Sequence, residues 1–222
     1  MKKILVIAPH PDDEVLGCGG TIAKHVKEGD EVYLCIVTKG YTPDWSEEFI
    51  KNRPKEIKKS NEILGIEKTY FLNFPTAKLD TIPQKELNDS ISNIVKEIKP
   101  EIVYAPHEGD LSKEHRLIFE AALVATRPKP GSSVKKILCY ETLSETEWGR
   151  NLIKKMFIPN VYIDISNTLK EKLKAMKAYK SELKEYPHPR SLEIIKALAK
   201  KRGSEAGLKF AEAFMLIREI GD

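Results

Sequence analysis

Short apolar runs alternate with longer amphipathic stretches along most of this chain. The first run, Ile4 to Ala8, is continuously apolar, which is typical of a parallel strand buried on both faces. Further strands are predicted at 31–38, 68–72, 101–105, 136–141 and, more briefly, 161–165. Helices are predicted at 15–27, 46–64, 83–98, 116–126, 168–183 and 192–201. This alternation predicts an α/β fold built from right-handed β–α–β crossovers.

Two elements are ambiguous from the pattern alone. Pro54 marks either a break or a late start in the helix 46–64, because proline cannot donate a helical hydrogen bond. The segment 208–220 fits a helix or a strand, and its apolar run 214–217 favours a strand. No repeat or linker divides the sequence, so we expect one domain over residues 1–222.

Composition narrows the class of protein. The chain has 222 residues, of which 41% are hydrophobic, enough for a sizeable core. Its net charge is +4, with both signs mixed along the chain, and it lacks the basic stripe expected of a nucleic-acid binder. No apolar run approaches the ~20 residues that span a bilayer. We therefore expect no signal peptide, no transmembrane segment and a cytoplasmic location, and three scattered cysteines predict no disulfide framework.

The first candidate site follows the first predicted strand. His10, Asp12, Asp13 and Glu14 lie within five positions, in a turn bracketed by prolines. Helix N-termini favour acidic residues, which accounts for one or two of these carboxylates but not for three beside a histidine. His10 and Asp13 are three apart, so one helical turn can direct both at one metal ion. His25 lies too far along the following helix to join them, and we expect it at the surface.

Glycines after this turn allow a second interpretation, a dinucleotide-binding loop. Such a loop needs its glycines at the strand-to-helix turn, where backbone N–H groups face a pyrophosphate. Here Gly17, Gly19 and Gly20 lie inside the predicted helix, and carboxylates occupy the turn. We therefore interpret the turn as a metal site and the glycines as close packing between helix and sheet.

Residues at the ends of other strands extend this candidate site, because ligands bind at the carboxyl ends of strands in open α/β sheets. The segment 101–107 repeats the order of apolar strand, proline and histidine, and it leads to Asp110 and His115. A catalytic zinc usually takes three protein ligands, and this segment is the best source of the third. Tyr41 and Trp45, after the second strand, either line a substrate site or are simply exposed.

Four segments together resemble a known family. They are Pro-His-Pro-Asp-Asp-Glu at 9–14, Gly-Asp-Leu-Ser-Lys-Glu-His-Arg at 109–116, His-Pro-Arg-Ser at 188–191 and the stretch 202–214. They resemble the zinc-dependent sugar N-deacetylases, which include LmbE-like proteins and N-acetylglucosaminylphosphatidylinositol (PIG-L) de-N-acetylases. The resemblance implies a single-domain, Rossmann-like three-layer sandwich with a mostly parallel central sheet and the site at the carboxyl ends of its strands.

The resemblance also implies a reaction. One Zn²⁺ per chain would be held by His10, Asp13 and His115, and Asp12 would be the general base toward the metal-bound water. The substrate would be a small N-acetylglucosamine-type amino sugar or its conjugate, which loses its acetyl group. Relatives in this family often form trimers or hexamers, so a homo-oligomer is expected.

Substrate contacts are less well marked. Arg53 resembles an arginine that holds substrate in some members. His107, Asp110 and Ser112, in the stretch 101–116, are further candidates for substrate contact. Asp110 alternatively orients His115, as metal-bound imidazoles usually require. Many members have a histidine where this chain has Ser112, and that histidine stabilises the tetrahedral intermediate. Its role then passes to His188, His107 or Ser112, or is lost.

Two other classes of function remain open at this stage. The departure at Ser112 fits a protein that binds metal or sugar without turnover. Two histidines and one carboxylate also form the metal site of non-haem iron oxygenases. Those enzymes need no neighbouring base such as Asp12, and their triad commonly lies in an all-β barrel.

Overall fold

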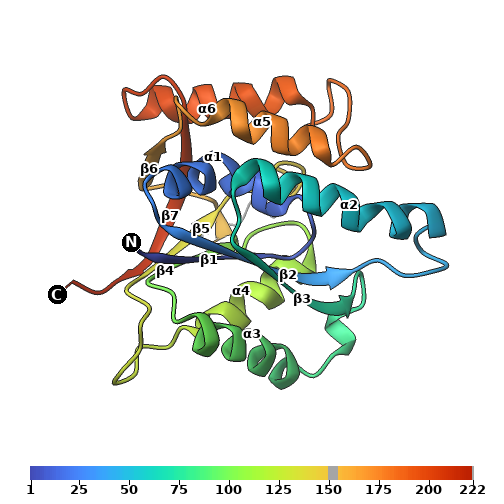
Figure 1. Cartoon of the computed structure of the whole chain (residues 1–222), viewed down its shortest axis with the longest axis vertical. Coiled ribbons are helices and arrows are strands. Elements are labelled where there is room, and N and C mark those ends of the chain that lie inside the picture. Colours follow the sequence, from blue (N-terminus) through green and yellow to red (C-terminus); the bar gives the residue numbers. More distant parts are fainter. Residues whose placement is uncertain (150–154, 222) are drawn as a thin grey trace.

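The computed structural model describes residues 1–149 and 155–221, and its central element is a seven-stranded sheet with the strand order β3-β2-β1-β4-β5-β7-β6 (Figure 1). The strands are β1 (Lys3–Ala8), β2 (Glu31–Lys39), β3 (Lys68–Pro75), β4 (Ile102–Pro106), β5 (Lys136–Tyr140), β6 (Val161–Asp164) and β7 (Ala211–Glu219). The first five pair in parallel, and β7 runs antiparallel to both β5 and β6. The predicted α/β class with a mostly parallel sheet is confirmed.

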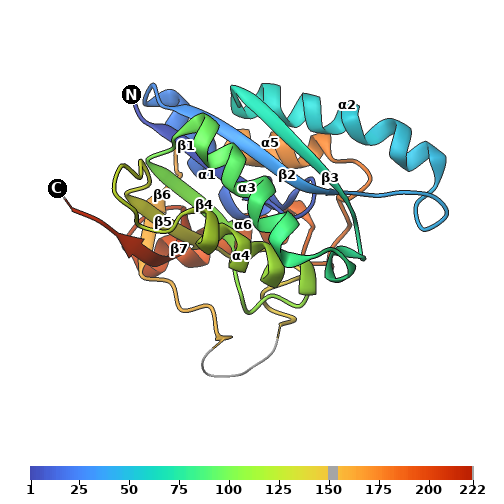
Figure 2. The same ribbon diagram turned by 90° about the horizontal axis from the view of Figure 1, so that it is seen from below.

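Helices cover both faces of this sheet, which makes three layers (Figures 1 and 2). On one face lie α1 (Asp13–Lys27), α2 (Glu47–Leu64), α5 (Leu169–Ala178) and α6 (Leu192–Glu205). On the other face lie α3 (Gln84–Ile98) and α4 (Lys113–Ala125), and a 3₁₀ turn, η1 (Leu79–Thr81), precedes α3. Among the described residues, none of the helices combines the length and the apolar character needed to cross a membrane.

Strand β1 explains why both faces are covered. Its side chains alternate, so Ile4 and Val6 enter the core under α1 and α2, while Leu5 and Ile7 enter the core over α3 and α4. All four are fully buried. Since β1 lies between β2 and β4, the chain reverses its direction of winding there, and the carboxyl end of β1 is the switch point where open α/β sheets bind ligands.

The glycines of α1 let this helix lie close to its neighbours. A Cβ atom on Gly17 would lie 2.2 Å from Cδ2 of Tyr140, and one on Gly20 would lie 2.7 Å from Cγ2 of Ile165. No side chain fits at either position without moving these neighbours. The interpretation of these glycines as close packing, rather than a dinucleotide loop, is confirmed.

A buried ion pair ties α1 to α5 and β7. Nζ of Lys172 lies 2.5 Å from Oε1 of Glu212 and donates to the carbonyl oxygen of Leu16 at 2.8 Å. The Glu212 carboxylate accepts from the backbone N–H groups of Gly20 and Thr21. Both charges are thus compensated inside the protein, and α1 is fixed near its middle from two other elements.

Several boundaries differ from the sequence prediction. Helix α2 continues through Pro54, whose exposed ring leaves the helix unbroken, and α4 begins at Lys113 rather than at Arg116 because Ser112 caps it. Helix α5 ends at Ala178, before Leu183. The ambiguous segment 208–220 contains strand β7, as its apolar run favoured.

The expectation for His25 is wrong. Its side chain is only 14% exposed, because Nδ1 bonds to Asp30 Oδ2 at 2.9 Å and Nε2 bonds to the buried Tyr104 hydroxyl at 3.0 Å. Both ring nitrogens therefore have partners at the end of the sheet opposite the candidate site.

Candidate metal and catalytic site

The turn between β1 and α1 is held in a strained conformation. Asp12 has φ 115°, in the left-handed region that non-glycine residues rarely adopt. Its N–H donates to Glu14 Oε2 at 3.0 Å, and its carbonyl oxygen accepts from Leu16 at 2.9 Å. The other oxygen of Glu14 accepts from the Tyr179 hydroxyl at 2.6 Å. Glu14, fully buried, therefore supports the turn rather than facing the site.

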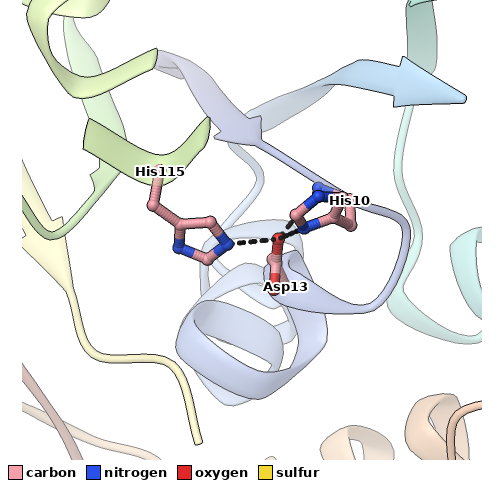
Figure 3. A group of neighbouring side chains, drawn as sticks. All are labelled: His10, Asp13 and His115. Atoms are coloured by element: carbon pink, nitrogen blue, oxygen red, sulfur yellow. Dashed lines mark hydrogen bonds and ion pairs between the residues drawn. The ribbon is translucent and has the colours of Figure 1, made fainter. Parts of the chain in front are cut away.

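His10, Asp13 and His115 converge on one point (Figure 3). Asp13 Oδ2 lies 3.2 Å from His10 Nδ1 and 3.3 Å from His115 Nε2. One donor atom from each residue lies within 4.8 Å of the other two, the arrangement that a shared metal ion requires. His10 and Asp13 come from the first turn, and His115 comes from the first helical turn of α4, after the neighbouring strand β4.

In each histidine, the ring nitrogen that faces away from Asp13 contacts a second carboxylate. His10 Nε2 lies 2.6 Å from Glu114 Oε2, and His115 Nδ1 lies 2.8 Å from Asp110 Oδ2. Such partners fix the tautomer and the ring orientation of metal-binding histidines. As a result, His10 presents Nδ1 and His115 presents Nε2 toward Asp13.

The environment of these three residues suits a cation. His115 is fully buried, and its Nε2 has no hydrogen-bond partner among the described residues. Burial alone would lower the pKa of His10, but hydrogen bonds to Asp13 and Glu114 outweigh it and raise that pKa to about 9. Burial would raise the pKa of Asp13, but His115 and His10 hold it well below its usual range. The surrounding carboxylates thus favour positive charge at this point, and two imidazoles with one carboxylate are a ligand set that fits zinc.

A cavity of about 470 Å³ opens beside this cluster, and His10, Asp12 and Asp13 lie in its wall. Its apolar wall is formed by Leu16, Ile36, Trp45, Phe49, Ile50, Ile57, Phe71 and Leu143. Its polar wall is formed by Thr38, Lys39, Arg53, Asn73, Thr76, Ser144, Glu145, Glu182 and Arg190. The cavity is of the size that binds small organic molecules. Of the two loop aromatics, Trp45 lies in this wall, and Tyr41 packs behind it at a ring distance of 5.6 Å.

Asp12 lies in the cavity wall beside the cluster and is 3% exposed. Burial is the main cause that raises its pKa well above the usual value, and the charge of Asp13 adds to this effect. The guanidinium groups of Arg53 and Arg190 act in the opposite direction. The Asp12 carboxylate therefore lies in the cavity wall beside the cluster of His10, Asp13 and His115, close to Arg190.

Two arginines and one glutamate connect Asp12 to the cavity wall. Arg190 Nη1 lies 3.4 Å from Asp12 Oδ2 and 2.6 Å from Glu182 Oε2. The second oxygen of Glu182 lies 2.9 Å from Arg53 Nη2, which also donates to the carbonyl oxygen of Pro11 at 2.8 Å. Arg53, expected to contact substrate, thus lies in the cavity wall and also holds the metal-site turn.

The structure does not bring the other four expected catalytic and substrate residues into this wall. His107 lies with Nε2 3.0 Å from the carbonyl oxygen of Lys155, and the Ser112 hydroxyl accepts from the N–H of Glu114 at the start of α4. His188 accepts the N–H of Arg190 on Nδ1 at 3.0 Å. None of the three is among the described residues that line the cavity. Asp110 bonds to His115 and lies behind the cluster.

The sequence interpretation missed Glu114, Glu145 and Arg190. Glu114 directly precedes His115, and a helix start at Ser112 would have placed it on the first turn facing β1. Glu145 lies in the cavity wall and accepts from the N–H of Ser112 at 2.8 Å, and burial raises its pKa. Arg190 belongs to the recognised 188–191 segment, but its proximity to Asp12 depends on the folded chain.

The chain is similar to a known protein family, to a named relative and to solved structures. The family model described as PIG-L, GlcNAc-PI de-N-acetylase, matches residues 5–126. The diacetylchitobiose deacetylase of Thermococcus kodakarensis is 30% identical, over 99% of this chain and 85% of that protein. Among solved structures, a conserved protein of Thermus thermophilus has a TM-score of 0.81 and 27% identity, over 100% of this chain and 97% of that one. The N,N'-diacetylchitobiose deacetylase of Pyrococcus horikoshii, complexed with an inhibitor, has a TM-score of 0.77 and 26% identity, over 98% and 84%.

Proposed function

Because this chain belongs to the PIG-L family of GlcNAc-PI de-N-acetylases, we propose that it is a zinc-dependent hydrolase of the N-acetyl group on N-acetylglucosamine-type amino sugars. The family resemblance expected from the sequence motifs is confirmed by these matches. The observation that carries the proposal is the convergence of His10, Asp13 and His115 beside Asp12 at the wall of a cavity.

The metal-binding part of the proposal rests on the donor atoms. His10 Nδ1, Asp13 Oδ2 and His115 Nε2 would hold one Zn²⁺ and leave a position open, as in other catalytic zinc sites. A bound Zn²⁺ supplies Lewis acidity and lowers the pKa of water. Glu114 and Asp110 keep the two imidazole rings in the orientation that this requires.

The proton transfers are assigned to Asp12. As the oxygen of water forms its bond to the acyl carbon, Asp12 accepts one proton from that water. The bond between the acyl carbon and the nitrogen then breaks, and the nitrogen takes the proton from Asp12. The products are the free amino sugar and acetic acid, which loses the second proton of the water to the solvent and becomes acetate. Asp12 suits this role because it lies in the cavity wall next to the ligand Asp13 and makes no hydrogen bond to the metal-binding histidines.

The substrate class rests on the relatives and on the size and walls of the cavity. Two relatives are named as deacetylases of diacetylchitobiose, which is an N-acetylated amino sugar. Trp45, Phe49 and Phe71 provide apolar surface for the C–H faces of a sugar ring, and Thr38 and Asn73 provide polar groups for its hydroxyls. A monosaccharide or a small conjugate fits a cavity of about 470 Å³.

The proposal is tested with a panel that contains N-acetylglucosamine, N,N'-diacetylchitobiose and N-acetylglucosamine conjugates. The protein is stripped of metal, and Zn²⁺ is then restored while free amine and acetate are both measured. We expect equimolar amine and acetate from at least one compound, only after Zn²⁺ is restored. Release that is equally fast in the stripped protein would rule out the metal-dependent reaction.

The same assay separates the two rival functions. A binding protein would take up Zn²⁺ and sugar without releasing amine. An iron oxygenase would need Fe²⁺ and consume O₂, and its triad is typical of all-β barrels rather than this α/β sheet. The cytoplasmic location and the trimeric or hexameric assembly expected from the sequence stay predictions.

A further inference from the structure

Hydrolysis of an amide places negative charge on the acyl oxygen, and enzymes stabilise this charge with a fixed donor. In the family pattern a histidine has this role, and this chain has Ser112 in its place. His107, His188 and Ser112 are not among the described residues that line the cavity. His107 Nε2 lies against the carbonyl oxygen of Lys155, the Ser112 hydroxyl caps α4, and His188 Nδ1 accepts from Arg190. If the proposed function is correct, a donor that assists the metal is therefore best sought among the residues that line the cavity.

Arg190 is placed where such a donor is required. It lies in the cavity wall, and its Nη1 is 3.4 Å from Asp12 Oδ2, the group that handles the proton. Its hydrogen bonds and ion pairs to Asp12 and Glu182 all use Nη1, and Nη2 forms none to the described residues. Because a guanidinium only donates, the unused N–H groups on Nη2 can donate to a substrate oxygen without breaking an existing bond.

The guanidinium of Arg190 is also held rigidly. Glu182 Oε2 lies 2.6 Å from Nη1, and the backbone N–H of Arg190 donates to His188 Nδ1 at 3.0 Å. Burial acts to lower its pKa, but the carboxylates of Asp12 and Glu182 outweigh burial and raise it, so the group stays charged. A fixed, charged donor in a largely buried site loses little free energy to reorganisation when charge develops nearby.

The second arginine of the cavity wall is less suited. Arg53 Nη1 donates to Ser181 Oγ at 2.8 Å and Nη2 donates to the carbonyl oxygen of Pro11 at 2.8 Å. Nη2 also pairs with Glu182. Both terminal nitrogens thus have protein partners, and Nη2 would have to release Pro11 or Glu182 in order to donate to the substrate.

The geometry points to Arg190 as the residue that donates a hydrogen bond to the acyl oxygen of the substrate and stabilises its negative charge. This role rests on the proposed function. As water bonds to the acyl carbon, the electron pair of the C=O double bond moves to the oxygen, next to the guanidinium. When that pair returns, the bond to nitrogen breaks, and the nitrogen takes the proton held by Asp12. His188 is then a positioning residue that fixes the backbone of Arg190.

The test compares Arg190→Met, Arg190→Lys and Arg190→Ala with the matched control Lys184→Met, an exposed cation on the same loop. For Arg190→Met we expect kcat to fall about 10²- to 10³-fold, with the content of bound zinc unchanged. Arg190→Lys should retain part of the rate, and guanidinium ion in the assay should restore activity to Arg190→Ala. A purely structural role would show no such rescue.

A binding measurement makes the test independent of turnover. Methylphosphonate has the tetrahedral shape and the anionic oxygens of the acyl centre after attack, and its binding to the full-length protein with Zn²⁺ is followed by NMR. We expect Arg190→Met to weaken methylphosphonate binding at least tenfold. Lys184→Met should keep the affinity within twofold of the wild type.

The outcomes separate the two proposals. The role of Arg190 would be overturned if the wild type turns over, kcat of Arg190→Met stays within threefold of the wild type, and both bind methylphosphonate equally well. That result would leave the deacetylase proposal intact. Absence of turnover with methylphosphonate binding that depends on Arg190 would support the anion-binding role and contradict the proposed function. Absence of both would contradict both.

Discussion

At the scale of single residues, the site is built from pairs in which one side chain fixes another. Glu114 uses both carboxylate oxygens, one toward His10 Nε2 at 2.6 Å and one toward the N–H of Ala77 at 2.8 Å. It therefore links the metal-site turn to the loop after β3. The His10 ring cannot rotate without losing this bond, so its Nδ1 stays directed at Asp13.

We predict that Glu114→Gln weakens zinc binding about 10- to 100-fold. Glutamine has one acceptor oxygen, so its side chain cannot accept from both His10 and Ala77. The affinity is measured by competition with a chromogenic chelator, and Glu120→Gln, an exposed position on the same helix, is the control. An affinity of Glu114→Gln equal to that of the control would show that the contact with His10 does not orient the ligand.

The residues of the candidate metal site could be predicted from the sequence, but the partners that orient them could not. His10 and Asp13 lie three apart, so local spacing was enough to group them. Glu114 bonds to a residue 104 positions away, and Arg190 pairs with a residue 178 positions away. Such contacts depend on which strands are neighbours and on how a loop closes over the sheet, and no local pattern specifies them.

At the scale of elements, α1 is fixed by charge as well as by close packing. Lys172 from α5 and Glu212 from β7 are both almost fully buried, and each bonds to the backbone of α1. Removing one partner leaves the other charge uncompensated in the interior, which is the costly case for a buried pair.

We predict that Lys172→Met destabilises the protein by about 3–5 kcal/mol. The Glu212 carboxylate would stay buried without its cation, and the carbonyl oxygen of Leu16 would lose a donor. Urea unfolding gives the free energy, and Lys174→Met, exposed on the same helix, is the control. The double variant Lys172→Met, Glu212→Gln should lose less free energy of unfolding than Lys172→Met alone. A larger loss of stability in the double variant would contradict this explanation.

Element types were predicted better than their ends. Apolar runs identified β1, β4 and β5, because these strands are buried on both faces, whereas the edge strand β3 is partly exposed. The end of α5 was missed because the amphipathic pattern continues beyond Ala178, whereas Tyr179 leaves the helix and its hydroxyl bonds to Glu14. The expected break or late start of the helix at Pro54 is not observed, since α2 continues through this residue. In these cases a tertiary contact or an exposed face determines the boundary.

At the scale of the whole molecule, one sheet connects two cores. The core between the sheet and α1, α2, α5 and α6 shares strand β1 with the core over α3 and α4. The site lies at the carboxyl ends of β1 and β4, where both layers meet the sheet. The alternation of elements in the sequence predicted this position of the site. The cavity walls could not be predicted, because they depend on where the loops after β2 and α5 lie in the folded chain.

Because both cores share the central strands, we predict that the chain unfolds as a unit. Far-ultraviolet circular dichroism reports the whole sheet, and fluorescence reports Trp45 and Trp148. Their urea transitions should have the same midpoint, which is the usual test for cooperative unfolding. Separate midpoints would show that residues 1–222 do not behave as the single domain expected from the sequence.

In the proposed function, Asp12 performs proton transfer beside a metal held by His10, Asp13 and His115. The most direct measurement is amine release by Asp12→Asn and wild type, each with its zinc content determined in the same sample. We predict equal zinc content and a rate for Asp12→Asn lower by about 10²- to 10⁴-fold, because the amide cannot accept the proton. An Asp12→Asn rate close to that of the wild type at equal zinc content would contradict the assignment.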